Sequence, residues 1–469
     1  MERVSKSTYY KCGIAVAIAA IIATIAWLLW PKSYEDMIPA EAKAVVCFDG
    51  QSFHDMLSDN DQGMLQELSK KGQGLDLSHP VYGIVTPNEY LCIVAKVSDE
   101  AKIEAMLTAI EGKKVNSETY DDRHWVWLSD GWLASWDGRS FLCVGPGVAQ
   151  ERDVLRQTIT SMVNTGDKFV DTPAFDHLKA QRGSIKLFAQ MDAIPAPYNM
   201  LFRFNIPSDC DPAAVEVLAS ADLKVKGGQL SVTQLDCSIT SENADIVAAI
   251  DAYEKEKGCI EADATSHNDS ILFRLATSTK GKPLLQLLKT DATLRGLLMG
   301  LNQTFDADKL LGSTDGMFCI EINSFAKDWT PAFCLKAETH TPHLFADADY
   351  WMESAKKQKS VTLKRNGENA FFLDGEKQQL HFGLLPQACE LYFASPSMLS
   401  WAKEPFAFKK SDKKDGTLVF FHINLDRLNQ QPCMKDGTIA NIINKILPSS
   451  AHGLTYEARM GRKATLRFE

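Results

Sequence analysis

The feature that most constrains this chain is an unbroken apolar stretch near its N-terminus. The eighteen residues from Gly13 to Trp30 carry no charge, and Thr24 is the one polar side chain among them. A helix rises about 1.5 Å per residue, so this stretch would be about 27 Å long, close to the hydrocarbon thickness of a bilayer. The sequence therefore predicts a transmembrane anchor over residues 13–30.

The residues beside this stretch predict its orientation. Three basic side chains precede it and one closely follows it, namely Arg3, Lys6 and Lys11 and then Lys32. Basic residues favour the cytoplasmic side of a membrane, so residues 1–12 are expected to form a cytoplasmic tail. Trp27 and Trp30 then lie at the far membrane interface, where indole rings are favoured. The body after residue 30 is expected in the periplasm.

Two other processing routes fit the stretch less well. A cleaved signal peptide has a shorter apolar core that ends in small residues, whereas this core ends in the bulky sequence WLLWP at residues 27–31. A bacterial lipoprotein carries its lipidated cysteine directly after the core, whereas Cys12 precedes it. We therefore expect a signal-anchor that is retained as a single pass through the cytoplasmic (inner) membrane, with cleavage as the alternative.

The composition of the exported part is that of a folded protein. The chain has 45% hydrophobic and 23% charged residues, as soluble domains do, and the roughly 437 residues after the anchor suit two domains. Four of the 50 basic and one of the 60 acidic residues lie in residues 1–32, which leaves 46 basic and 59 acidic side chains and a net charge of −13. This balance disfavours non-specific binding to nucleic acid or to anionic lipid.

The ten cysteines after the anchor do not resemble a disulfide framework. Five of them lie inside apolar runs that are typical of strands, namely Cys47, Cys92, Cys143, Cys319 and Cys334. A cysteine in such a run usually behaves as a small buried hydrophobic residue. A bridge stays open among the other five, which are Cys210, Cys237, Cys259, Cys389 and Cys433.

The order of the predicted elements after the anchor occurs twice. Each half opens with an apolar strand, AKAVVCFDG at residues 42–50 and SILFRLA at residues 270–276. Helical segments follow at 51–71 and at 281–312, and a hairpin follows each of them. The later parts also correspond, because FLCVGPGVAQ in one half and LYFASPSMLS in the other both change from a strand through a proline to a helix.

These correspondences predict the fold class and the domains. We expect an α+β fold in which a unit of mostly antiparallel sheets with packed helices is duplicated. The first repeat is expected at residues 38–258 and the second at 266–469. The second strands of the two hairpins, YLCIVAK and AFCLKAE, place Cys92 and Cys334 at equivalent positions.

The chain also resembles a known family. The opening MIPAEAKAVVCFDGQSFHDML, the duplicated body and the strand-proline-helix segments are similar to a large family of cell-envelope proteins of Bacteroidetes, known as a domain of unknown function. The resemblance covers nearly all of the exported part and depends on the sequence IPA, an acidic residue and an apolar strand. It implies an extracytoplasmic location and no catalytic or binding residues. Many relatives are lipoproteins, whereas this chain lacks the lipid-bearing cysteine.

A tryptophan-rich hairpin is the first candidate for partner binding. If Asp130 and Gly131 form a two-residue turn, Trp125 faces Trp136 across the hairpin. All four indoles then share one face of the sheet, namely those of Trp125, Trp127, Trp132 and Trp136. Such a face suits a protein or a glycan partner. The alternative is that the indoles pack in a core.

The apolar insert PAPYNMLFRFNIP, residues 195–207, is the second candidate. Tyr198, Leu201 and Phe202 are expected to share one face of a helix. That face would contact a partner or the membrane, or it would fill the groove between the two halves.

The sequence contains no motif that identifies a reaction. It has no nucleophile elbow, no phosphate-binding loop, no dinucleotide glycine pattern and no HExxH sequence, so no catalytic residue, cofactor or metal is expected. We expect a non-catalytic, membrane-anchored binding or scaffold protein that binds a protein or glycan component of the cell envelope. The alternative is a hydrolase of envelope polymers whose carboxyl groups come together between the two repeats.

Overall fold

The computed structural model of the chain describes residues 33–50, 73–195, 199, 202–226, 229–261, 271–357, 361–375, 379–406, 408–411, 416–434 and 451–469. The predicted anchor at 13–30, with Trp27 and Trp30, lies outside the described residues, as do the predicted helix at 51–71 and Tyr198. Within the described ranges, no helix is long and apolar enough to cross a membrane.

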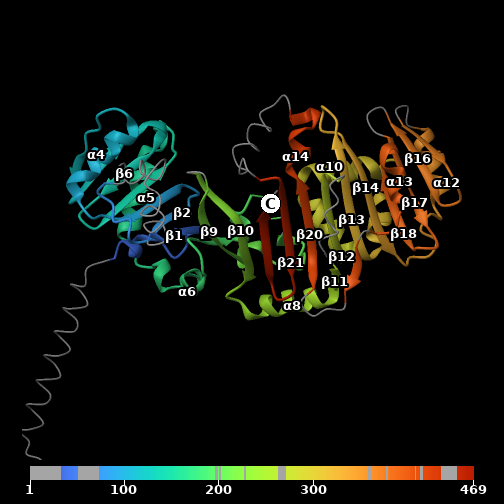
Figure 1. Cartoon of the computed structure of the whole chain (residues 1–469), viewed down its shortest axis with the longest axis horizontal. Coiled ribbons are helices and arrows are strands. Elements are labelled where there is room, and N and C mark those ends of the chain that lie inside the picture. Colours follow the sequence, from blue (N-terminus) through green and yellow to red (C-terminus); the bar gives the residue numbers. More distant parts are fainter. Residues whose placement is uncertain are drawn as a thin grey trace, which may run out of the picture.

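The first half contributes ten antiparallel strands to one large sheet (Figure 1). Their alternation of buried and exposed side chains fits strands with one face in a core, as in β1 and β2. From the outer edge inward the order is β4 (Glu118–Tyr120), β5 (Arg123–Trp127), β6 (Leu133–Trp136), β7 (Ser140–Gly145), β3 (Leu91–Lys96), β2 (Val81–Val85), β1 (Ala44–Phe48), β8 (Ile185–Gln190), β9 (Glu216–Lys226) and β10 (Gln229–Thr240).

The second half repeats this order of pairing. From its outer edge inward the strands are β15 (Val361–Arg365), β16 (Ala370–Gly375), β17 (Gln379–Leu385), β18 (Glu390–Ala394), β14 (Pro331–Thr339), β13 (Thr314–Phe325), β12 (Phe273–Lys280), β20 (Thr417–Asn424), β21 (Gly453–Arg459) and β22 (Lys463–Phe468). Two short strands, β11 (Cys259–Glu261) and β19 (Lys409–Ser411), pair with each other, and β11 also pairs with β20.

The register of the two halves corresponds as well as their strand order. Cys92 of β3 pairs with Val144 of β7, and Cys334 of β14 pairs with Ala394 of β18. Val144 and Ala394 each lie two residues before a proline. The halves meet where β10 pairs with β22, so the C-terminal strand lies in the middle of the molecule (Figure 1).

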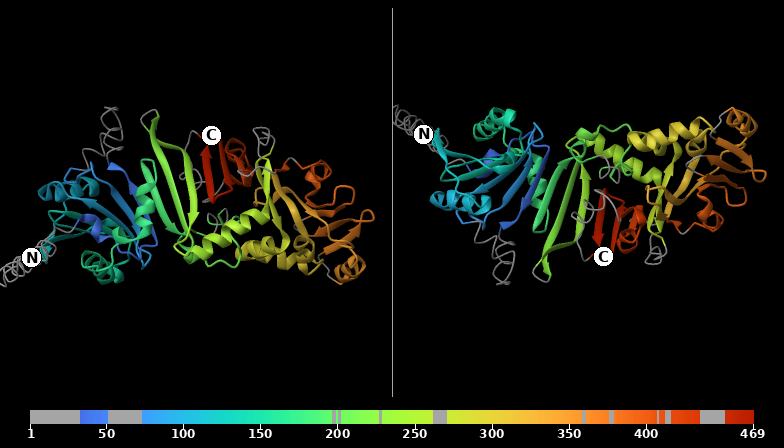
Figure 2. Two further views of the ribbon diagram at one scale, coloured as in Figure 1. Left: turned by 90° about the horizontal axis from the view of Figure 1, so that it is seen from below. Right: turned by 90° about the horizontal axis from the view of Figure 1, so that it is seen from above.

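Helices cover the sheet. They are α4 (Glu100–Glu111), α5 (Arg152–Val163), α6 (Pro173–Ala180), α8 (Ala244–Lys257), α9 (Gly281–Thr290), α10 (Ala292–Asn302), α11 (Ala307–Gly312), α12 (Ala348–Lys356), α13 (Leu399–Ala402) and α14 (Leu425–Asn429). Asp99 caps the start of α4 and Gly112, at φ 68°, ends it. In Figure 2, α8, α9 and α10 lie along one side of the second half. The structure is thus a mixed α/β fold with a large antiparallel sheet, as predicted.

The cysteines behave as the sequence predicted. The five in apolar strands are buried and form no disulfide with another described residue. Burial raises the pKa of the Cys143 and Cys237 thiols to about 12, which makes both poor nucleophiles.

Candidate functional site

The tryptophan hairpin has a different register from the predicted one. His124 pairs with Trp136 and Trp125 pairs with Ser135, one residue away from the expected pairing. The loop has three residues rather than two, since Leu128 N donates to Trp132 O at 2.9 Å and Ser129–Gly131 form a short 3₁₀ turn. When the pairing of two strands shifts by one residue, side chains of the two strands that would have shared a face of the sheet lie on opposite faces. The prediction that the four indoles share a face was therefore wrong.

The indoles of this hairpin lie in two separate cores. Trp125 and Trp127 belong to the core beneath α5, where Trp125 is buried and Trp127 is partly buried. Trp136 and Trp132 belong to the core beneath α4, where Trp136 is only 1% exposed. The guanidinium of Arg152 lies 5.0 Å from the ring centre of Trp127. A partner surface made of these four side chains stays a prediction, and their burial favours the core alternative.

The insert at 195–207 contributes to the junction between the halves. Phe202 packs edge-on against Tyr456 of β21, with 6.1 Å between the ring centres. Phe202 is partly buried among residues of both halves. This placement fits the groove-filling alternative for Phe202.

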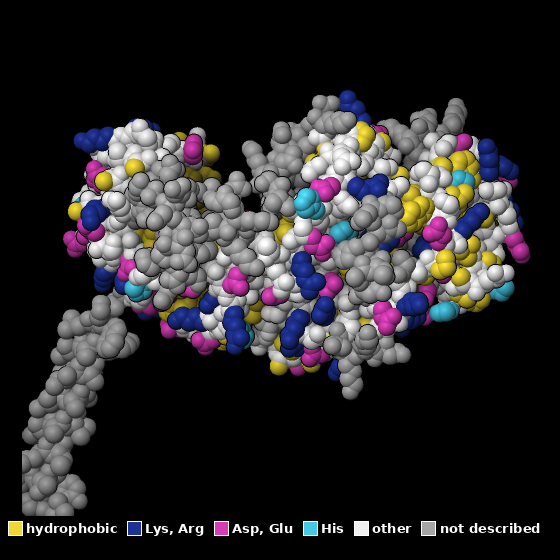
Figure 3. Space-filling view, in the orientation of Figure 1, with side chains coloured by type: hydrophobic (Ala, Val, Ile, Leu, Met, Phe, Trp, Pro, Cys, Tyr) yellow, Lys and Arg dark blue, Asp and Glu magenta, His cyan; other side chains and the backbone are white. Residues whose placement is uncertain are grey.

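Charge alone does not mark a site on the surface. Basic and acidic side chains are interspersed over the face of the second half in Figure 3. In the part of the chain that the structure describes, no group of three or more His, Cys, Asp or Glu side chains is arranged to hold a metal ion.

An apolar cavity lies between the second-half sheet and its helices. Side chains alternate along a strand, so residues two apart share a face. One face of β12, β13 and β14 lines the cavity with Phe273, Leu275, Phe318, Ile320, Ile322, Pro331, Phe333 and Leu335. Each strand thus presents a continuous row of apolar side chains to the same space.

The helices close the cavity from the other side. Leu294, Leu298 and Leu301 of α10 lie three to four residues apart and therefore share one helix face. Leu288 of α9 and Leu311 of α11 also line the cavity. The caps of α10 and α11 are Asp291 and Asp306, whose side chains accept from Leu294 N and Lys309 N. These caps fix where each helix begins over the sheet.

The cavity is large and almost entirely apolar. Its volume is about 560 Å³, and of the nineteen described residues that line it, only Thr330 has a polar side chain. Leu297 of α10 lines the cavity and is 48% exposed. Ligand pockets in proteins typically measure about 300–1,000 Å³ and are mostly apolar. The cavity therefore has the size and lining of a binding site for an apolar group.

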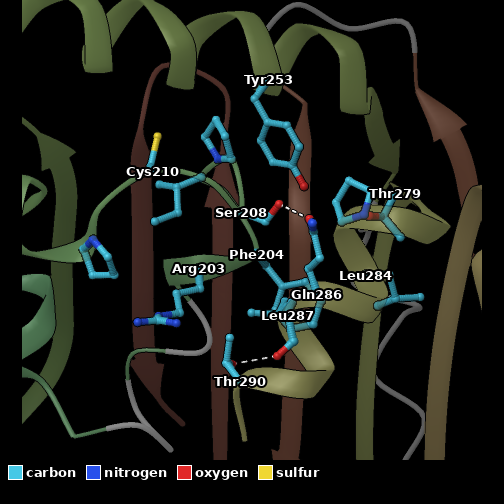
Figure 4. Close-up of a pocket in the computed structure, with 14 residues that line it drawn as sticks. Arg203, Phe204, Ser208, Cys210, Tyr253, Thr279, Leu284, Gln286, Leu287 and Thr290 are labelled. Carbon is cyan, nitrogen blue, oxygen red and sulfur yellow. Dashed lines mark hydrogen bonds between the residues drawn. The ribbon is translucent and has the colours of Figure 1, made fainter. Parts of the chain in front are cut away.

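A smaller and more polar cavity adjoins the apolar one. It measures about 280 Å³ and lies between residues 203–212 and α9 (Figure 4). The Ser208 hydroxyl donates to Gln286 Oε1 across it. Phe204 lines both cavities.

A third cavity differs from the other two in its many charged lining residues. It measures about 590 Å³, and charged residues of both signs line it, namely Asp209, Glu256, Asp315, Lys257, Lys280 and Lys282. Lys257 is buried, donates to Phe204 O, and has a pKa that burial lowers to about 7. The hydrolase alternative would need two carboxyl groups about 5–10 Å apart across a bound glycan, and it stays a prediction.

Sequence reasoning missed the apolar cavity although the signal was present. The leucines of segment 281–312 recur at helical spacing, which predicts a helix. They are also more numerous than one buried helix face needs. Whether such leucines interdigitate with a sheet or leave space depends on how far the helix lies from the sheet. That distance is a tertiary property, which the leucine spacing does not contain.

Comparison with known proteins places the chain in a family. No curated protein matches it. Crystal form IV of TP0453 matches 43% of this chain and 80% of its own at 14% identity and a TM-score of 0.27, and crystal form III matches 49% and 89% at 15% and 0.28. Scores this low do not establish a common fold. Residues 62–442 match the family described as domain of unknown function DUF4836, and the chain therefore belongs to that family.

Proposed function

We propose that this protein is a non-catalytic binding protein of the cell envelope and that its ligand carries a long hydrocarbon chain, which occupies the apolar cavity. The observation that carries the proposal is the lining of that cavity, where eighteen of nineteen described residues are apolar. The cavity leaves apolar side chains in contact with water, as the 48% exposure of Leu297 shows, and leaving such a side chain exposed instead of buried costs about 1.5–3 kcal/mol.

A hydrocarbon ligand offsets this cost because it supplies the missing contacts. Burial of a methylene group contributes about 0.8 kcal/mol. The strand side of the cavity presents aromatic and branched side chains, and the helix side presents leucines. Neither side offers a row of hydrogen-bonding groups for a sugar or a peptide. A hydrocarbon chain is therefore favoured over the protein or glycan partner expected from the sequence.

The proposal keeps the predicted placement of the chain. Residues 13–30 would hold the protein in the cytoplasmic membrane with the body in the periplasm, as the basic residues before the stretch indicate. The equivalent strand order of the two halves supports a duplicated α+β unit. In this arrangement the cavity belongs to the second repeat and lies close to the junction with the first.

Photolabelling tests the proposal directly. The full chain in lipid nanodiscs is mixed with a hexadecanol analogue that carries a diazirine in mid-chain, irradiated and digested. We expect label on peptides of α10, β13 and β14. Leu335→Trp places a larger side chain in the cavity, so it should lower this labelling about tenfold or more, since each excluded methylene removes about 0.8 kcal/mol.

The matched control adds the same indole elsewhere. Val148 is 61% exposed in the first half, so Val148→Trp should leave the labelling unchanged. Label spread over surface peptides, or equal labelling of Leu335→Trp and Val148→Trp, would refute the proposal.

A further inference from the structure

We infer that the ligand is a single-chain amphiphile with an anionic headgroup, and that Arg203 binds this headgroup in the smaller cavity. The inference rests on the proposed function, because the hydrocarbon part of the ligand occupies the apolar cavity. It adds a second site, a chemical class of headgroup and the residue that selects it.

Arg203 is the charged residue of the smaller cavity. Among the described lining residues it is the only one with a charge, and none carries a carboxylate. Its Nε is shielded from solvent and has no hydrogen-bond partner in the described part of the chain. A shielded guanidinium nitrogen without a partner loses the hydrogen bonds it would make in water. An anion in the cavity would meet the guanidinium of Arg203 as the only charge among the described lining residues.

The headgroup chemistry follows from the guanidinium. Its planar donors match the two oxygens of a carboxylate or the oxygens of a phosphate. The other polar side chains of the cavity are neutral, and several of them already have partners: Ser208 donates to Gln286 Oε1, Thr279 to Lys280 O at 3.4 Å, and Thr290 to Leu287 O at 2.7 Å. Figure 4 shows these side chains together with Arg203 among the residues that line the cavity. The cavity therefore favours a negative headgroup.

The two cavities are adjacent, as an amphiphile requires. Phe204 directly follows Arg203 and lines both cavities. Helix α9 also lies between them, with Leu284 and Leu287 toward the smaller cavity and Leu288 toward the apolar one. A ligand with its charged end at Arg203 would pass Phe204 and place its chain among the leucines of α10. The phenyl ring of Phe204 is thus positioned to pack against the first methylenes.

Competition against the photolabel tests the inference. Hexadecanoate, hexadecanol and acetate are compared as competitors on the full chain in nanodiscs. We expect hexadecanoate to compete roughly ten- to a hundredfold better than hexadecanol, the gain of a charged hydrogen-bonded pair, and acetate not to compete. In Arg203→Gln this difference should vanish, while hexadecanol should compete as well as in the wild type, which also reports that the variant is folded.

The control is the same substitution on a neighbouring surface. Arg295 lies on α10 and is exposed, so Arg295→Gln should keep the preference for hexadecanoate. Equal competition by hexadecanoate and hexadecanol in the wild type would overturn the inference and leave the proposed function intact. The inference is also overturned if Arg203→Gln keeps the preference for hexadecanoate. If neither long-chain compound competes, the proposed function fails, and the inference fails with it.

Discussion

At the scale of single residues, Lys257 is the most unusual ionisable group described. Its ammonium group is buried at the junction, where Nζ donates to Phe204 O and lies 3.5 Å from Asn205 Oδ1. Burial lowers its pKa to about 7, and the Glu254 carboxylate acts in the opposite direction. Few proteins bury a lysine without an ion pair. Here the cation holds the segment that carries Arg203 and Phe204 against α8.

This depressed pKa predicts how stability changes with pH. In the unfolded chain a lysine has a pKa of about 10.4. Between about pH 7 and pH 10 the unfolded state therefore binds a proton that the folded state has lost, so the contribution of Lys257 to stability rises with pH, by up to about 1.4 kcal/mol per pH unit. Below about pH 7 both states are protonated and the full penalty of burying the charge remains.

Urea unfolding across this pH window measures the effect. The free energy of unfolding of the wild type should rise relative to that of Lys257→Met as the pH increases. Lys255 lies on the same helix and is exposed, so Lys255→Met should follow the wild type. Parallel pH profiles for the wild type and Lys257→Met would show that the buried lysine is not the cause.

At the scale of elements, α10 contains two glycines that its packing does not require. A Cβ atom added at Gly296 or Gly300 would meet no described atom within 4 Å. Each glycine in a helix interior costs about 0.5–1 kcal/mol relative to alanine. The helix that forms one wall of the apolar cavity is therefore weaker than its surroundings demand, which suits a wall that opens for a ligand.

The double substitution Gly296→Ala/Gly300→Ala tests this weakness. It should raise the free energy of unfolding by about 1–2 kcal/mol and slow the release of the hexadecanol photoprobe. Gly281→Ala is the contrast, because its Cβ would lie 2.2 Å from Gly312 O, so it should destabilise the protein. If the double variant is no more stable than the wild type in urea, Gly296 and Gly300 do not weaken α10.

Individual elements also show what the sequence predicts and what it does not. Strands β3 and β14 lie within a residue or two of the predicted segments YLCIVAK and AFCLKAE, because local alternation and turn residues determine them. The tryptophan hairpin differs because its loop contacts a distant segment. Gly147 N donates to Gly131 O at 2.9 Å, and a Cβ at Gly131 would lie 2.0 Å from Gly147 O. That contact, absent from the local sequence, accompanies the three-residue loop.

The candidate site also shows that the sequence predicts the elements but not how they pack together. The apolar rows of β12, β13 and β14 follow from a period of two, and the leucines of α10 follow from the helical period. Their meeting around an unfilled space does not follow from either period. Arg203 likewise stands in an insert whose sequence predicts only an apolar segment. Its isolation from carboxylates becomes visible only when the neighbouring elements are in place.

At the scale of the whole molecule, the pairing of β10 with β22 joins the halves into one sheet. Cys237 pairs with Ala464 in this junction, and both side chains lie in the same core. Directly paired residues of antiparallel strands have Cα atoms about 4.5–5.5 Å apart, within the range of a disulfide. Ala464→Cys should therefore form a disulfide with Cys237 when the reduced, unfolded chain is refolded under oxidising conditions, because both thiols are accessible before they are buried.

Peptide mass spectrometry without reduction detects this bridge. Thr465 is one residue further along β22 and pairs with Asp236, so its side chain lies on the opposite face of the sheet. Thr465→Cys should leave Cys237 as a free thiol. A bridge in Thr465→Cys, or none in Ala464→Cys, would mean that the register of the junction is different.

The central position of β22 has a consequence for the newly made chain. Roughly 220 residues separate β10 from β22, and at a translation rate of about 5–20 residues per second their synthesis takes on the order of ten to forty seconds. During that interval the hydrogen-bonding edge of β10 has no partner from β22, and an open edge invites pairing with other chains. Protection of this edge is thus a matter of timing, and a holdase that binds extended strands would act on the half-finished protein, before the second repeat exists.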